Sequence, residues 1–170
     1  MSILAIVQAR TSSSRLPGKV LLPIGSKPMI IYQLERLLRC TRIDRVFLAT
    51  SDHSSDDTLA ELVAAAGFPV FRGDLSDVLE RYRACAAKEH ATTVVRLTGD
   101  CPLIDPALID ELVEAFADGG WDYLANCADE QQLSVPDGFD AEVFRAELLE
   151  RAAREASLSS EREHVTPWFR

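Results

Sequence analysis

Short apolar runs alternate with segments of helical periodicity along the first 125 residues of the chain. The apolar runs, several of them rich in β-branched residues, predict strands at residues 3–7, 46–50, 69–71 and 92–97. Apolar residues at helical spacing predict helices at 28–39 and 56–66, and further helices that begin near 76 and 106. Because consecutive parallel strands need helical crossovers, this alternation predicts an α/β fold with a mostly parallel sheet and helices on both faces.

Residues at the element boundaries give finer predictions. Pro28 suits the first position of a helix with Ser26 as its cap, and Ser76 suits the cap of the third helix. Asp105 followed by Pro106 predicts the start of the fourth helix. The remaining pattern predicts a turn at 23–28, a strand at 121–125, a polar loop at 126–137, a short strand at 139–144 and a helix at 146–156.

Polar residues follow three of the predicted strands at the point where each strand ends. These segments are Gln8–Lys19, Ser51–His53 and Thr98–Pro102. The carboxyl ends of parallel strands meet at one edge of a sheet, which is where open α/β sheets bind ligands. We therefore expect the three segments to lie along the same edge.

The charge distribution singles out the first of these segments. Residues 1–34 contain four basic side chains and no Asp or Glu, whereas the whole chain has a net charge of −9. Cations that converge past the end of a strand predict an anion site for a polyanion such as a triphosphate. The alternative is that these lysines and arginines are ordinary solvated surface charges.

Asp100 is the single residue whose position most strongly suggests chemistry. It follows a predicted buried strand and precedes Pro102, so its carboxylate is expected at the same sheet edge as the basic segment. A carboxylate that faces a triphosphate suits a Mg²⁺ ion that bridges phosphate oxygens. The alternative is a turn aspartate that caps its own loop.

Several other classes are disfavoured. Gly18-Lys19 is followed by Val20 rather than Ser or Thr, so the phosphate loop of P-loop enzymes is absent, and so is the glycine pattern of dinucleotide-binding domains. The acidic composition argues against a nucleic-acid surface. No apolar run is long enough for a bilayer, and no signal peptide is evident. Four scattered cysteines fit a reducing, cytoplasmic setting, and 170 residues fit one domain.

Five motifs, in order, resemble a known family. Residues 9–19 followed by 25–30, and later 98–104, resemble the signature of sugar-acid cytidylyltransferases, such as the synthetases of CMP-linked neuraminic and ketodeoxyoctonic acids. Segments 71–73 with 77–82, 136–144 and 162–167 resemble the spore-coat polysaccharide biosynthesis (SpsF) branch of that family. The resemblance covers essentially the whole chain.

This resemblance implies a fold and a reaction. The implied fold is a three-layer α/β/α sandwich with a Rossmann-like sheet of the nucleotide-diphospho-sugar transferase type. The implied reaction is attack by a sugar hydroxyl on the α-phosphate of CTP, with Mg²⁺ as cofactor and pyrophosphate as the leaving group. The acceptor would be a sugar acid or a related surface-polysaccharide precursor. Such phosphoryl-type transfer depends on positioning and charge neutralisation, which agrees with the absence of a nucleophilic triad.

The resemblance also implies roles for individual residues. Arg10, Arg15 and Lys19 would hold the triphosphate, and Asp100 would bind the metal. Further substrate contacts are expected from Ala9, Ser13, Gly18, Ser51, Asp52, Arg72, Asp140 and Glu142. Among these, Ser51 and Asp52 would face the base and ribose. Asp140 and Glu142 would line the sugar side, with an acidic surface hairpin as the alternative.

Length is the one departure from the family pattern. Members of this branch continue past the segment 162–167 and carry a second expected metal ligand there, whereas this chain ends at Arg170. We therefore expect a single nucleotidyltransferase domain over 1–170 that is shorter than the family at its carboxyl end. A homodimer is one expectation. A non-catalytic nucleotide-binding domain and an enzyme that uses another nucleoside triphosphate are the alternatives.

Overall fold

The computed structural model describes residues 2–13, 16–127 and 135–170. A six-stranded mixed sheet forms its centre, with the strand order β5-β4-β1-β6-β8-β7. The strands are β1 (Ile3–Gln8), β4 (Arg45–Ser51), β5 (Val70–Gly73), β6 (Thr93–Thr98), β7 (Tyr123–Ala125) and β8 (Glu142–Arg145). The helices are α1 (Met29–Leu37), α2 (Asp57–Ala65), α3 (Val78–Lys88), α4 (Pro106–Gly119), α5 (Glu147–Glu155) and α6 (Ser159–His164).

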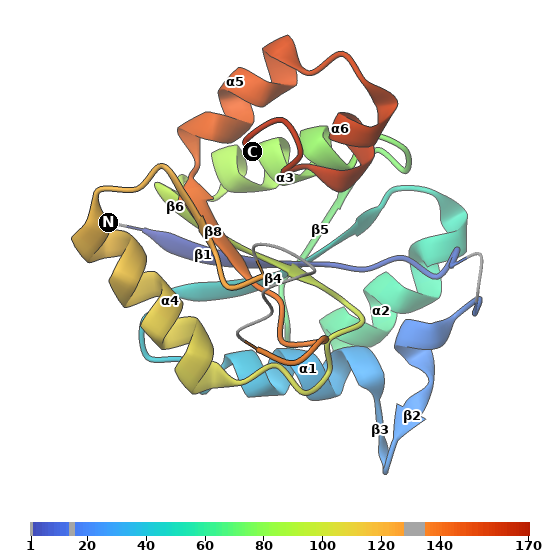
Figure 1. The fold of residues 1–170 in the computed structure, drawn as a ribbon. Helices are drawn as coiled ribbons and strands as arrows, with labels where there is room; N and C mark the ends of the chain where they lie inside the picture. Colours follow the sequence, from blue (N-terminus) through green and yellow to red (C-terminus); the bar gives the residue numbers. More distant parts are fainter. Residues whose placement is uncertain (1, 14–15, 128–134) are drawn as a thin grey trace.

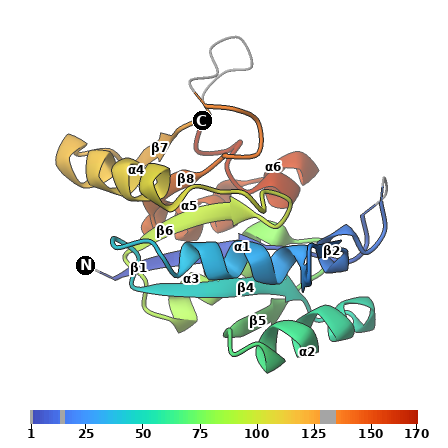
Figure 2. The ribbon, with the colours of Figure 1, turned by 90° about the horizontal axis from the view of Figure 1, so that it is seen from below.

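The helices form one layer on each face of the sheet. Figures 1 and 2 show α1, α2 and α4 on one face, and Figure 1 shows α3, α5 and α6 on the other. The central strand β1 is buried on both faces, and its alternate side chains serve the two layers: Ala5 and Val7 pack with the first core, Leu4 and Ile6 with the second. The predicted α/β/α sandwich is therefore confirmed.

Strand direction determines which loops share an edge. β1 pairs in parallel with β4 on one side and with β6 on the other, and β5 continues the parallel part. β8 is antiparallel to both β6 and β7, so the sheet is mostly but not wholly parallel. As predicted, the segments that follow Gln8, Ser51 and Thr98 leave the same edge of the sheet.

Some of the predicted boundaries are wrong. Pro28 precedes α1 as its N-cap residue, and the helix begins at Met29 without a side-chain cap. The expected turn at 23–28 is a small antiparallel hairpin of β2 (Pro23–Ile24) and β3 (Lys27–Pro28), which projects from the body of the molecule (Figure 1). Asp77 rather than Ser76 caps α3, because its carboxylate accepts a hydrogen bond from the backbone N–H of Glu80.

Other boundaries agree with the sequence pattern, and one element was not predicted. Asp105 caps α4 by accepting from the N–H of Ala107, with Pro106 in the first turn. Helix α6 lies in a segment for which periodicity predicted nothing. Residues 128–134 of the expected polar loop lie outside the described residues. Within the described ranges, no helix combines the length and the apolar character needed to cross a bilayer.

Candidate active site

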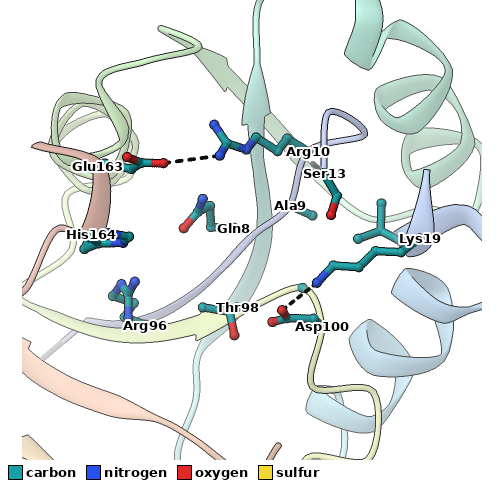
Figure 3. A pocket seen from close by; sticks show the side chains of 12 residues that line it. Gln8, Ala9, Arg10, Ser13, Lys19, Arg96, Thr98, Asp100, Glu163 and His164 are labelled. Atoms are coloured by element: carbon teal, nitrogen blue, oxygen red, sulfur yellow. Dashed lines mark hydrogen bonds and ion pairs between the residues drawn. The ribbon is translucent and has the colours of Figure 1, made fainter. Parts of the chain in front are cut away.

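A cleft of about 300 Å³ lies at the carboxyl ends of β1 and β6 (Figure 3). One side comes from the end of β1 and the loop after it, namely Gln8, Ala9, Arg10, Ser13, Lys19 and Val20. The other side comes from β6, the loop after it and the end of α6, namely Arg96, Thr98, Gly99, Asp100, Glu163 and His164. Segments that are far apart in sequence thus meet at the edge where open α/β sheets bind ligands.

Lys19 and Asp100 form an ion pair across this cleft. The Lys19 Nζ donates to Asp100 Oδ2 at 2.7 Å, although the two residues are 81 positions apart. Their side chains keep 27% and 44% of their exposure, so both can still reach a ligand. Figure 3 shows the lysine extending toward the carboxylate from the opposite wall. The sequence analysis placed these two residues at one site, and the structure brings them into contact.

Gly99 explains how closely the two loops approach each other. Its backbone N–H donates to the carbonyl of Gln8 at 2.7 Å. A Cβ at this position would lie 2.7 Å from the Cβ of Ala9, which is closer than two carbon atoms can pack. The absence of a side chain at Gly99 therefore allows the loop after β6 to lie against the loop after β1.

The charge state of Asp100 follows from its surroundings. Burial acts to raise its pKa, but the hydrogen bonds from Lys19 and Thr98 and the lysine charge outweigh burial, so the pKa lies below its usual value of 3.8. Asp100 is therefore ionised at neutral pH. An ionised, half-exposed carboxylate is a suitable oxygen ligand for a hard cation such as Mg²⁺.

A buried carboxylate fixes the start of the loop after β1. Asp56 is fully buried and accepts hydrogen bonds from the N–H and hydroxyl of Thr11, at 2.8 and 2.7 Å, and from the N–H and hydroxyl of Ser51. Burial acts to raise the pKa of Asp56, and these hydrogen bonds more than compensate, so the pKa is lowered. The loop closes further along, where Gly18 has a φ of +71° and donates its N–H to the Thr11 carbonyl at 2.8 Å.

Arg10 faces a second carboxylate on the opposite wall. Its Nη2 lies 3.3 Å from Glu163 Oε1, and both side chains line the cleft. Glu163 sits near the end of α6, and the neighbouring Arg162 pairs with Asp77 at the start of α3. Each of the two described cations in this part of the cleft, Arg10 and Lys19, therefore has a carboxylate partner.

A smaller pocket of about 140 Å³ adjoins the cleft and shares Arg96 and Thr98 with it. Asp140 lines this pocket. Burial and the negative charges of Asp137 and Asp100 raise its pKa. Asp140 thus lies near enough to Asp100 for the two charges to interact, and it comes from the segment assigned to the sugar side.

Glu142 also lines this pocket and belongs to a polar network. Its side chain is 3% exposed, and its carboxylate pairs with Arg96 and accepts hydrogen bonds from Tyr123, Thr166 and Arg170 at 2.7–2.8 Å. Because donors from four residues already occupy both oxygens, this side chain is arranged to hold Arg96 and the carboxyl-terminal segment in place.

Three other predicted contact residues lie away from the described cleft. Ser51 is fully buried, and its hydroxyl donates to Asp56. The N–H of Asp52 donates to the Gly73 carbonyl, and its side chain is exposed beyond β4. Arg72 pairs with Asp57 at 2.6 Å and donates to the carbonyls of Ser51 and His53. The structure therefore shows them bracing the end of β4.

Arg15 and the residue before it lie outside the described residues. Of the remaining predicted contacts, Ala9 and Ser13 line the cleft, and Gly18 shapes the loop without lining it.

Arg96, Glu163 and His164 also line the cleft, although the residue pattern did not mark them as site residues. Arg96 interrupts an otherwise apolar strand, and that interruption was a usable signal. Glu163 and His164 belong to a motif that was noticed only through the family resemblance, because no periodicity marks α6.

The fold agrees with the nucleotide-diphospho-sugar transferase type. A family model described as cytidylyltransferase matches residues 4–170, and this chain belongs to the cytidylyltransferase family. The spore coat polysaccharide biosynthesis protein SpsF of Bacillus subtilis (strain 168) is 38% identical over 173 residues, covering 99% of this chain and 70% of that protein.

Two solved structures extend this comparison. A cytidylyltransferase from Leptospira borgpetersenii serovar Hardjo-bovis superposes with a TM-score of 0.92 at 37% identity, covering 99% of this chain and 70% of the other. The synthetase of CMP-linked 2-keto-3-deoxy-manno-octonic acid, solved with CTP, superposes with a TM-score of 0.76 at 21% identity, covering 99% of this chain and 84% of the other. At 21% identity, the comparison with this synthetase shows a similarity of fold.

Proposed function

We propose that this protein transfers CMP from CTP to a sugar acid or a related surface-polysaccharide precursor, with release of pyrophosphate. The observation that carries the proposal is the contact between Lys19 and Asp100, which places a cation and an ionised carboxylate on facing walls of one cleft. Family membership supports the use of CTP, and the complex of a structural relative with CTP is consistent with it.

The cations would hold the phosphates of the nucleotide. Arg10 and Lys19 approach the cleft from the loop after β1, and Arg15 would join them. Their charges would neutralise phosphate oxygens, and the leaving pyrophosphate would stay bound to the same side chains. Ser13 lies between Arg10 and Lys19 (Figure 3) and can donate its hydroxyl to a phosphate oxygen.

Mg²⁺ fits the oxygen donors of this site. Among residues 2–13, 16–127 and 135–170, no group of three or more His, Cys, Asp or Glu gathers around a metal position. Mg²⁺ at phosphate-transfer sites is commonly bound by one or two carboxylates together with substrate phosphates, so Asp100 plus a triphosphate meets the requirement. When bound there, the ion would neutralise phosphate charge and orient the α-phosphate for attack.

The acceptor would occupy the smaller pocket beside Asp140. That pocket opens next to the Asp100 side of the cleft and contains the polar groups of Arg96, Thr98 and Asp140, which can hydrogen-bond sugar hydroxyls. Glu142 lines the same pocket and would act by holding Arg96, since its oxygens are already occupied. A homodimer stays a prediction, which light scattering would test.

The proposal can be tested by measuring pyrophosphate release from CTP and Mg²⁺ in the presence of a panel of sugar acids. We expect release with at least one acceptor, and a loss of at least about a hundredfold in a Lys19→Ala, Asp100→Ala double variant, since electrostatic groups at such centres contribute about that much each. Lys27→Ala, Asp118→Ala is a matched control, because Lys27 on the hairpin pairs with Glu35 of α1 and Asp118 is exposed on α4.

The outcomes separate the alternatives. Undiminished release from the Lys19, Asp100 variant would rule out this site. Binding of CTP by calorimetry without turnover on any acceptor would favour a non-catalytic nucleotide-binding domain. Release with UTP or GTP but not with CTP would keep the site and change the nucleotide.

A further inference from the structure

We propose that Glu163 sets the affinity of the cleft for nucleotide phosphates, because its carboxylate occupies Arg10 at a position that a phosphate oxygen must take over. This inference rests on the proposed function, since it requires the cleft to bind a polyphosphate. It assigns a role to α6, which the family signature of the phosphate-binding loop does not include.

The contact itself is direct. Arg10 Nη2 and Glu163 Oε1 are 3.3 Å apart, with 34% and 51% of the two side chains exposed. Figure 3 shows the glutamate reaching from the α6 side of the cleft toward the guanidinium. A pair this exposed is weak and can exchange its partner for an incoming anion.

The backbone on both sides prevents Glu163 from simply moving away. Arg162 pairs with Asp77 and donates to the carbonyl of Ala153 at 3.0 Å, which ties α6 to α3 and α5. On the other side, the buried Val165 has a φ of +70°, and the N–H of Thr166 donates to the carbonyl of His164 at 2.8 Å. This tight turn is rare for a β-branched residue and persists only where packing enforces it.

The next residue completes the anchoring. The hydroxyl of Thr166 donates to Glu142 at 2.8 Å, so the segment after α6 is joined to β8. The backbone of Glu163 is therefore held at the wall of the cleft, and its side chain can release Arg10 only by rotating. Once a triphosphate is bound, the carboxylate stays within range of its negative charges.

This arrangement differs from the pair formed by Lys19 and Asp100. Asp100 can bind a metal ion when the nucleotide arrives, so its negative charge then favours nucleotide binding. Glu163 lies on the Arg10 side of the cleft, where the incoming group is itself an anion. Its net effect is to oppose phosphate binding and to favour the release of pyrophosphate after the reaction.

The test compares the wild-type chain with Glu163→Gln, which preserves the shape and a hydrogen-bond acceptor but removes the charge. Calorimetry with CTP and Mg²⁺, and separately with inorganic pyrophosphate, should show binding tighter by about three- to fivefold, the scale expected for an exposed charge pair. The gain should shrink as salt is raised. Glu155→Gln on the exposed side of α5 is the control and should bind like the wild type.

The results also distinguish this inference from the proposed function. If the wild type binds CTP and Glu163→Gln binds it equally or more weakly, the inference is wrong, while the cleft still binds the nucleotide that the proposed function requires. If the wild type binds pyrophosphate but not CTP, a tighter Glu163→Gln still supports the role of Glu163 while the choice of CTP fails. If neither chain binds CTP or pyrophosphate, both proposals are wrong.

Discussion

Two ion pairs at β6 use the same chemistry in different surroundings. Asp100 pairs with Lys19 just beyond the strand, where the two side chains are 44% and 27% exposed. Glu142 pairs with Arg96 within the sheet, where they are 3% and 15% exposed. The exposed pair can exchange partners with a ligand at little cost, whereas the buried pair cannot lose a partner without leaving an uncompensated charge. Exposure therefore separates the residues available for chemistry from those that hold the site together.

The largest effect is expected from the buried pair. Glu142→Gln would leave Arg96 without its counter-charge and should lower the free energy of unfolding by about 3–5 kcal/mol. For a chain of this size that corresponds to a fall in Tm of about 10 °C. Urea unfolding followed by circular dichroism measures it. The control Glu155→Gln should change the unfolding free energy by less than about 0.5 kcal/mol. If Glu142→Gln is as stable as Glu155→Gln, the buried pair does not stabilise the fold as stated here.

A substitution in the exposed pair should reduce activity strongly and change stability little. Asp100→Asn should reduce pyrophosphate release by about a hundredfold, because the lost carboxylate is the proposed metal ligand. Its unfolding free energy should change by no more than about 1 kcal/mol. Kinetics and urea unfolding on the same preparation measure both quantities, with Asp118→Asn as the control. A large loss of stability would show that Asp100 belongs with the structural residues.

Asp56 combines features of both groups and should give an intermediate result. It is buried like Glu142, but two of its hydrogen bonds hold Thr11 beside Arg10. Asp56→Asn should lower the unfolding free energy by about 2 kcal/mol, since buried donors lose their partner. It should also raise the KM for CTP, because the loop loses its anchor. An unchanged KM in a folded variant would show that the loop does not need this carboxylate.

The smallest expected effect is on the Tm at acidic pH. Burial acts to raise the pKa of Glu142, but the Arg96 charge and the surrounding donors hold it below its usual value of 4.5. A carboxyl whose pKa is lower in the folded chain contributes stability above its unfolded pKa, and that contribution is lost as pH falls through the folded value. The Tm of the wild type should therefore fall below about pH 4.5, and Glu142→Gln should show a shallower fall. If the Tm of Glu142→Gln falls with acid as steeply as that of the wild type, other carboxyls, such as Asp56, cause the acid sensitivity.

The sequence allowed the layered fold to be predicted because the strands buried on both faces are continuous apolar runs and the helices keep their period. It also placed Lys19 and Asp100 at one edge, since each follows a parallel strand. Cap positions were less secure: Ser76 and Asp77 are both good cap residues, and tertiary packing chooses between them. The boundary at Pro28 failed because a short hairpin, which has no periodic signal, precedes α1.

The rest of the site depends on contacts that local pattern does not encode. Asp56 was assigned to a helix start, yet its carboxylate turns inward to bind Thr11 in the loop after β1 and Ser51 at the end of β4. Glu142 was assigned to the sugar side; it lines the smaller pocket, and the antiparallel pairing of β8 with β6 also places it opposite Arg96. Glu163 reaches Arg10 from 153 positions away. Such pairings become visible only when the chain has folded.

The most direct test of the central claim is the Mg²⁺-dependent gain in CTP affinity, measured by calorimetry with and without the ion. The wild type and Asp118→Asn should bind CTP more tightly when Mg²⁺ is present, and Asp100→Asn should lose most of that gain while remaining folded. If Asp100→Asn keeps the full gain, the carboxylate that faces Lys19 does not hold the metal, and the account of this cleft is wrong.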